Sequence, residues 1–135
     1  MTEMTFEAAV ESIPMVTEFV DAQLEAHDCS PKAQLQIDVA IDEILCNIAY
    51  YAYRPGTGSV TVQLEVKDGC AFLTFIDSGV PFNPLISKEP DVSLSAEERD
   101  IGGLGIFLVK KTMDELEYER HENQNVLKLV KKIDG

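Results

Sequence analysis

The sequence predicts a two-layer α/β sandwich, in which a mixed but mainly antiparallel sheet is covered on one face by three helices. Residues 30–53 carry apolar side chains at a helical period, residues 59–76 contain two strand-like runs around a tight turn, and residues 102–113 lead from glycines into another amphipathic helix. A helix with one apolar stripe must bury it against another layer, and a sheet with one apolar face provides that layer. At 135 residues the chain can bury a real core, so we expect one domain over residues 1–135.

The balance of acidic and basic residues excludes some kinds of binding partner. The chain has 24 acidic and 11 basic residues, and its net charge of −13 argues against binding nucleic acid or an anionic membrane through a general electrostatic surface. No apolar run approaches the roughly 20 residues that span a bilayer, and the first residues lack the pattern of a signal peptide. Because Cys29, Cys46 and Cys70 are odd in number and scattered, we predict neither disulfides nor a zinc site, and expect a reduced, cytoplasmic protein.

The first half of the chain predicts two helices. Residues 4–10 are compatible with a short strand, and the Ser-Ile-Pro sequence at residues 12–14 then begins a helix that ends near residue 28. The longer helix covers residues 30–53, because Ser-Pro at its start combines a capping hydroxyl with a proline at the first helical position. Its apolar face consists of Ile37, Ala40, Ile41, Ile44, Leu45, Ile48, Ala49 and Ala52.

Polar residues follow one edge of that long helix. At about 100° of turn per residue, Glu43, Asn47 and Tyr51 lie on a single line beside the buried stripe. A carboxylate and an amide are therefore expected half out of water, one turn apart, where a ligand could bind. The alternative is an ordinary helix surface, because Glu is common in helices and an Asn in mid-helix can face solvent or bond the preceding turn.

After a proline-glycine turn, the spacing of the apolar residues changes from a helical period to every second residue. Residues 59–66 read as a strand with one covered face, residues 67–69 as an Asp-Gly hairpin turn, and residues 70–76 as a more buried returning strand. We expect this pair at the centre of the sheet. A closing hairpin is predicted at residues 116–120 and 126–133.

The second strand ends in residues 77–84, which are rich in turn-forming residues. Gly79 would let the backbone pass close to a flat ligand, and Asp77, at the mouth of the sheet, would accept a hydrogen bond from it. The alternative is an ordinary turn.

A long segment without periodicity separates this turn from the third helix. Residues 85–101 carry many charges and no apolar face, which is typical of a lid or a disordered loop; we place the lid at about residues 84–101, with one helical turn at residues 93–99. The glycines that open residues 102–113 leave bare amide N–H groups at a helix start, where the helix dipole also favours an anion. The alternative is a flexible hinge before an ordinary helix.

Three signals therefore follow one another along the chain: a helix with Glu and Asn one turn apart, a strand ending in Asp-x-Gly, and a loop leading into Gly-x-Gly and a helix. The residues that carry them are Glu43 and Asn47, Asp77 and Gly79, and Gly103 and Gly105. In this order the chain resembles the ATP-binding domain of the GHKL superfamily, which implies the Bergerat fold. Within that superfamily the chain resembles bacterial anti-sigma-factor serine kinases of the RsbW type. Three features carry this resemblance: the short chain, the sequence of residues 42–53, and Gly-Gly-Leu-Gly-Ile-Phe-Leu-Val-Lys-Lys at residues 102–111.

The resemblance implies a site for ATP and Mg²⁺. Asp77 would accept from the adenine amino group, Asn47 would supply a neutral oxygen to Mg²⁺, and Glu43 would accept a proton from the attacking serine hydroxyl of a partner protein. Residues 103–106 would lay backbone amides against the phosphates beneath the lid. The implied ATP-binding set is Asn47, Tyr51, Asp77, Gly79, Val80, Phe82, Gly103, Leu104, Gly105 and Ile106.

The same resemblance implies an ATP-dependent serine protein kinase that acts as an anti-sigma regulatory factor. It would phosphorylate a small anti-sigma-factor antagonist of the STAS type, hold a sigma factor in alternation, and form a homodimer. The alternatives are a nucleotide-gated partner-binding module without kinase activity and a metabolic enzyme with an unrelated site. A histidine kinase catalytic domain is disfavoured, because the chain has no helical dimerisation segment with a phosphorylatable His.

Some positions depart from the pattern of that family. Three tyrosines between residues 50 and 53 stand where relatives often have a histidine-containing helix end, and Gln124-Asn125 stands where Gly-Thr is common. Asn125 could still offer a polar contact. Arg99 is the nearest candidate for a lid arginine that touches the γ-phosphate.

Overall fold

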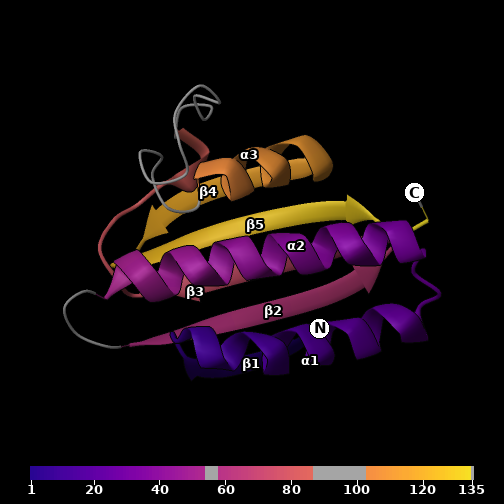
Figure 1. Cartoon of the computed structure of the whole chain (residues 1–135), viewed down its shortest axis with the longest axis horizontal. Helices are drawn as coiled ribbons and strands as arrows, with labels where there is room; N and C mark the ends of the chain where they lie inside the picture. Colours follow the sequence, from indigo (N-terminus) through magenta and orange to yellow (C-terminus); the bar gives the residue numbers. More distant parts are fainter. Residues whose placement is uncertain (54–57, 87–102, 135) are drawn as a thin grey trace.

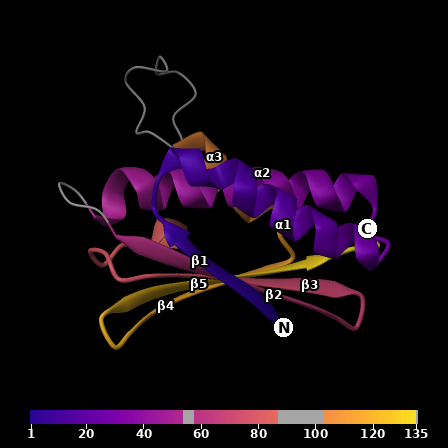
Figure 2. The ribbon, with the colours of Figure 1, turned by 90° about the horizontal axis from the view of Figure 1, so that it is seen from below.

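In the computed structural model the chain folds into two layers, with helices packed on one face of a sheet (Figure 2). The structure describes residues 1–53, 58–86 and 103–134. Across these residues the sheet has five strands in the order β1-β2-β3-β5-β4, and each of its four pairings is antiparallel. The predicted sandwich is therefore confirmed. Its elements are β1 (Thr2–Glu7), α1 (Ile13–Ala26), α2 (Pro31–Asn47), β2 (Ser59–Lys67), β3 (Cys70–Asp77), α3 (Gly103–Thr112), β4 (Glu115–His121) and β5 (Gln124–Lys132).

The helices lie side by side over the sheet, with α2 between α1 and α3 (Figure 1). The start of α2 is capped as predicted: the Ser30 hydroxyl accepts a hydrogen bond from the Ala33 N–H at 3.1 Å, and Pro31 is the first helical residue. Apolar side chains of α1 and α2 meet the inner face of the sheet in one core. Its largest fully buried members are Phe75, Leu24, Ile37, Ile41, Leu73 and Leu129.

The long helix does not continue as an α-helix to residue 53. Its α-helical part ends at Asn47, and a π-helix, η2 (Ile48–Ala52), follows. A π-helix has a wider turn than an α-helix and commonly occurs at functional sites. The apolar spacing of residues 30–53 does not distinguish the two, so the change of helix type lay outside the prediction.

Both hairpins turn through two residues with positive φ. Asp68 and Gly69 have φ of 54° and 76°, and Glu122 and Asn123 have φ of 50° and 65°. Positive φ at both central residues is the type I′ geometry, whose twist matches that of the flanking strands. The predicted hairpins are confirmed, and β3 lies at the centre of the sheet between β2 and β5.

The register of β3 and β5 brings distant residues together. Asp77, the last residue of β3, is paired with Asn125, near the start of β5. The cover predicted at residues 84–101 is described only at Pro84–Ile86, a single 3-10 turn. The helical turn expected at residues 93–99, including Arg99, lies outside the described residues. None of the described helices is long and apolar enough to cross a membrane.

Candidate active site

A pocket opens at one end of the sheet, between the end of α2, the turn after β3 and the first turns of α3. It encloses about 460 Å³ of empty space, open solvent at its mouth included. Most of its wall is apolar, with a few polar groups, which is the usual composition of a small-ligand site. The lining residues are Ile44, Asn47, Ile48, Tyr51, Ala52, Phe75, Asp77, Val80, Phe82, Pro84, Ile106, Tyr118, Asn125 and Leu127.

Buried polar side chains are concentrated in this pocket. Among the described residues, Asn47, Asp77 and Asn125 are the buried polar or charged ones, with exposed fractions of 8%, 5% and 6%, and all three line the pocket. Burying a polar group costs free energy unless it is hydrogen-bonded. Their convergence therefore marks this pocket as a place built for polar recognition.

The Asp77 carboxylate is held by two donors. Its Oδ1 accepts hydrogen bonds from the Gly79 N–H and from the Asn125 side-chain amide, both at 2.9 Å. Within the described part of the chain both bonds use Oδ1, which leaves Oδ2 as the oxygen that could accept a hydrogen bond from a ligand. The acceptor role expected of Asp77 stays a prediction.

Asn47 brings a buried amide to the wall of the pocket. It is the last residue of α2, and its Nδ2 atom is buried without a hydrogen-bond partner in the described part of the chain. A buried amide N–H without a hydrogen-bond partner destabilises the folded protein, and a bound polar ligand that accepts from it would remove this destabilisation. By turning, the same amide presents its oxygen, a ligand type that Mg²⁺ prefers, so the residue fits the metal role expected of it.

Glu43 lies one helical turn before Asn47 and contacts the start of α3. A Cβ built on Gly105 would overlap the Glu43 carboxylate and lie 2.5 Å from its Cγ, so the side chain rests directly on the glycine backbone. Burial, and then the neighbouring charge of Asp42, raise the pKa of the Glu43 carboxyl above its ordinary value. Glu43 is not part of the pocket wall, but the residue after Gly105, Ile106, is.

Gly79 allows the turn after β3 to contact the end of η2 closely. A Cβ at this position would overlap the Ala52 carbonyl and lie 2.5 Å from the Ala52 Cβ, and the Val80 N–H donates to the same carbonyl at 2.9 Å. The Arg120 guanidinium also donates to the Gly79 carbonyl at 2.8 Å. The glycine thus lets the turn after β3 pack against the end of η2, and the close approach of its backbone to a ligand stays a prediction.

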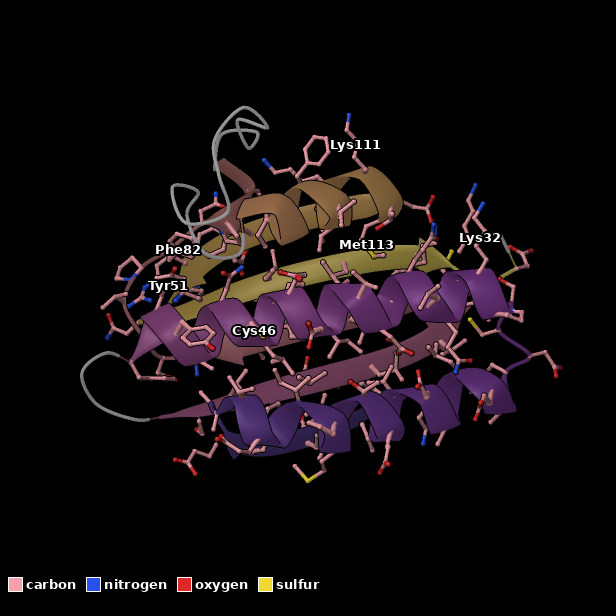
Figure 3. The ribbon with its side chains drawn as sticks, in the orientation of Figure 1. Lys32, Cys46, Tyr51, Phe82, Lys111 and Met113 are labelled. Carbon is pink, nitrogen blue, oxygen red and sulfur yellow. The ribbon has the colours of Figure 1, made fainter. Side chains whose placement is uncertain are left out.

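Two aromatic rings stand at the mouth of the pocket. Tyr51 and Phe82 are 36% and 43% exposed, their ring centroids are 6.4 Å apart, and the planes are tilted by 31° (Figure 3). Val80, 52% exposed, lies in the same turn as Phe82. Exposed apolar surface beside buried acceptors suits a flat, partly polar ring.

The structure brings most of the predicted site residues together. Asn47, Tyr51, Asp77, Val80, Phe82 and Ile106 line the pocket. Gly103 and Gly105 belong to the first turn of α3, while the Leu104 side chain lies outside the described part of the chain.

Two polar lining residues, Asn125 and Tyr118, were not among the predicted site residues. The departure from the Gly-Thr pattern had already drawn attention to Asn125. The sequence carried no comparable signal for Tyr118, because only the pairing of β4 with β5 brings its hydroxyl to Asn125.

A helix-covered antiparallel sheet, with a mainly apolar pocket at its end that contains a few buried polar groups, defines an α/β sandwich with a small-ligand site. The model of the family described as histidine kinase-like ATPase domain matches residues 6–131. The chain therefore belongs to the histidine kinase-like ATPase domain family.

Several relatives of the chain are named serine-protein kinase RsbW. The chain is 28% identical over 93 residues to the serine-protein kinase RsbW of Bacillus mycoides (strain KBAB4), and 30% identical over 93 residues to that of Bacillus cereus (strain B4264). Each match spans 66% of this chain and 58% of the relative, so the alignment covers little more than half of those proteins. The resemblance to the RsbW group inferred from the motifs is thus confirmed.

Solved structures confirm the fold. The chain resembles the blue-light activated histidine kinase of Erythrobacter litoralis EL346, with a TM-score of 0.58 and 17% identity over 78% of this chain and 32% of that one. It also resembles the catalytic domain of the histidine kinase ThkA, with a TM-score of 0.56 and 14% identity over 99% of both chains.

Proposed function

We propose that this protein is an ATP-dependent serine protein kinase that acts in the cytoplasm as an anti-sigma regulatory factor. Its substrate would be a serine of a small anti-sigma-factor antagonist of the STAS type, and its second partner a sigma factor. The family supports ATP as the phosphoryl donor, and relatives named serine-protein kinase RsbW support serine as the acceptor. We further propose that residues 1–135 form one kinase domain and that the active form is a homodimer.

In this proposal a different group at or beside the pocket would bind each part of ATP. Asp77 Oδ2 would accept from the adenine amino group, and Tyr51 and Phe82 would flank the ring at the mouth. The N–H groups at the start of α3, residues 103–106, would bind the phosphates, since a helix N-terminus favours anions. Mg²⁺ bound by Asn47 and the phosphates would neutralise charge on the transferred group.

The observation that carries the kinase proposal is the position of Glu43. Its carboxylate lies against Gly105 in the first turn of α3, one helical turn from the amide of Asn47. A serine hydroxyl approaching phosphates held at that helix start would meet Glu43, which would accept its proton. A raised pKa makes the carboxylate a stronger base, which favours this role.

Incubation with labelled ATP, Mg²⁺ and candidate antagonist proteins tests the proposal. Glu43→Gln should lower the rate of phosphate transfer by about 10²- to 10⁴-fold while ATP affinity stays nearly unchanged, because only the base is lost. Glu18→Gln, the same change at an exposed position of α1, is the matched control. Full transfer by Glu43→Gln would exclude Glu43 as the base.

The same experiment separates the kinase from a module that only binds. Tight ATP binding by the wild-type protein, with no labelled phosphate on any antagonist, would support a nucleotide-gated partner-binding module instead. Co-purification with a sigma factor, with and without ATP, then tests the second partner.

A further inference from the structure

The side-chain amide of Asn125 uses its whole hydrogen-bonding capacity within the protein. Its Nδ2 donates to Asp77 Oδ1 at 2.9 Å and to the Val80 carbonyl at 2.8 Å. Its Oδ1 accepts from the Phe82 N–H at 3.3 Å and from the Tyr118 hydroxyl. An amide has two N–H donors and two acceptor sites on oxygen, so all four are occupied.

The four partners also determine which way the amide points. The Val80 carbonyl can only accept and the Phe82 N–H can only donate, so the nitrogen of Asn125 must face the first and its oxygen the second. The nitrogen is thereby directed at Asp77 as well. Because no donor or acceptor is left over, Asn125 lines the pocket without a group to offer a ligand.

Its effect on a ligand must therefore pass through Asp77. Asn125 and the Gly79 N–H together occupy Asp77 Oδ1, which fixes the plane of the carboxylate and leaves Oδ2 as the acceptor for a ligand. A fixed, acceptor-only group favours a ring edge that carries a donor and opposes one that carries a carbonyl oxygen. Tyr118 supports this arrangement from β4 by holding the amide oxygen.

We propose that Asn125, oriented by Tyr118, is a positioning residue that makes the pocket select a purine with an exocyclic amino group over one with a carbonyl at the same place. This inference rests on the proposed function, in that the ligand is a purine nucleotide. It gives β4, through Tyr118, and β5, through Asn125, a part in base selection beside Asp77 of β3.

Titration calorimetry with ATP and with inosine 5′-triphosphate, which has a carbonyl in place of the amino group, tests this selection. The wild-type protein should bind ATP about tenfold or more tightly than the inosine nucleotide. In Asn125→Asp two carboxyl groups face each other and cannot both ionise, so they share one proton at neutral pH. Asp77 is then no longer a fixed, acceptor-only group, and the ATP preference should fall to about onefold. The preference should also become dependent on pH as the pair titrates.

Two further variants test the role of Tyr118 and control for the chemical change. Tyr118→Phe removes one hydroxyl and keeps the ring, so it should fold and lower the ATP preference by about threefold. Asn123→Asp makes the same chemical change at the exposed tip of the β4–β5 turn and should leave both affinities unaltered.

The outcomes separate this inference from the proposed function. A wild-type protein that binds neither nucleotide overturns both. A wild-type protein that prefers ATP, with the same preference and no pH dependence in Asn125→Asp, overturns the positioning role alone. Equal loss of both nucleotides in Asn125→Asp and Tyr118→Phe, at constant preference, also overturns it, because a purely structural role predicts that pattern.

Discussion

The Glu43 carboxylate rests on the backbone of Gly105, in the space that any larger residue would fill with its Cβ. Glu43 belongs to α2 and Gly105 to the first turn of α3, so this contact joins the two helices that bound the pocket. It gives a physical reason for the second glycine of the Gly-x-Gly sequence. The glycine leaves room for a carboxylate beside a helix start.

Gly105→Ala is expected to move the Glu43 carboxylate and leave the fold intact. The new Cβ would overlap the Glu43 side chain from its carboxylate to its Cγ, and this flexible side chain can turn away to make room. A general base displaced by about 1 Å slows phosphate transfer by about 10²-fold. Transfer assays combined with thermal unfolding measure both effects.

A double-mutant comparison checks that the effect passes through Glu43. Adding Gly105→Ala to Glu43→Gln should slow transfer no further, because the base is already absent. Leu108→Ala, at an exposed position of α3, is the control for a helix substitution away from the contact. Additive losses in the double variant would show that Gly105 acts independently of Glu43.

The pH dependence of transfer should report the raised pKa of Glu43. Transfer needs the ionised carboxylate, so the rate should fall as the pH drops through that pKa. Asp42→Asn removes the like charge that contributes to the upward shift, so the acid limb should move to lower pH. A rate profile unchanged by Asp42→Asn would contradict the electrostatic part of this account.

Local features of the fold were predictable because short segments determine them. This holds for three features: the Ser-Pro start of α2, the Asp-Gly turn at residues 68–69 and the glycines in the first turn of α3. Each depends on the conformations that its own residues allow. Asn47, Asp77 and Gly105 could be placed near one another because their motifs occur in an order that one family shares.

The hydrogen-bond network around Asn125 was not predictable in this way. Asp77 and Asn125 are 48 residues apart and meet only through the register of β3 and β5. The contact between Gly79 and Ala52 likewise depends on the π-helix η2, which has the same apolar pattern as an α-helix. Long-range pairing and helix type therefore had to come from the structure.

Gly79→Ala should destabilise the protein more than Gly69→Ala. The Cβ at position 79 would overlap the Ala52 carbonyl, a backbone group that cannot turn away and that binds the Val80 N–H. We expect a loss of about 2–3 kcal/mol in the free energy of unfolding. At Gly69 a Cβ meets nothing within 4 Å, and the positive φ alone should cost about 1 kcal/mol.

Urea unfolding of both variants measures this difference. Equal losses at the two glycines would show that the turn after β3 can move away from η2, contrary to the tight contact described above.

A carboxyl pair between α1 and α2 should make stability depend on pH. Burial, a hydrogen bond with Asp21 and the charges of Asp21 and Glu25 raise the pKa of Asp38 from 3.8 to about 8. Between these values the folded state binds more protons than the unfolded state, so the contribution of Asp38 is fully present below pH 3.8 and is lost as the pH rises through about 8.

Asp38→Asn should therefore stabilise the protein more at pH 9 than at pH 4, and flatten the decline of the free energy of unfolding between them. Urea unfolding across this range measures the slope, with Glu18→Gln on α1 as the control for removing one negative charge. A decline as steep in Asp38→Asn as in the wild-type protein would contradict the assignment.

The central claim is that Asn47, Asp77 and the start of α3 together form a site for ATP. Calorimetric titration of the wild-type chain with ATP and Mg²⁺, repeated on Asp77→Asn, tests it most directly. We expect one saturable site per chain, with a dissociation constant between about 1 µM and 1 mM, and affinity at least about tenfold weaker in Asp77→Asn. No saturable binding, or equal affinity in the variant, would contradict the account.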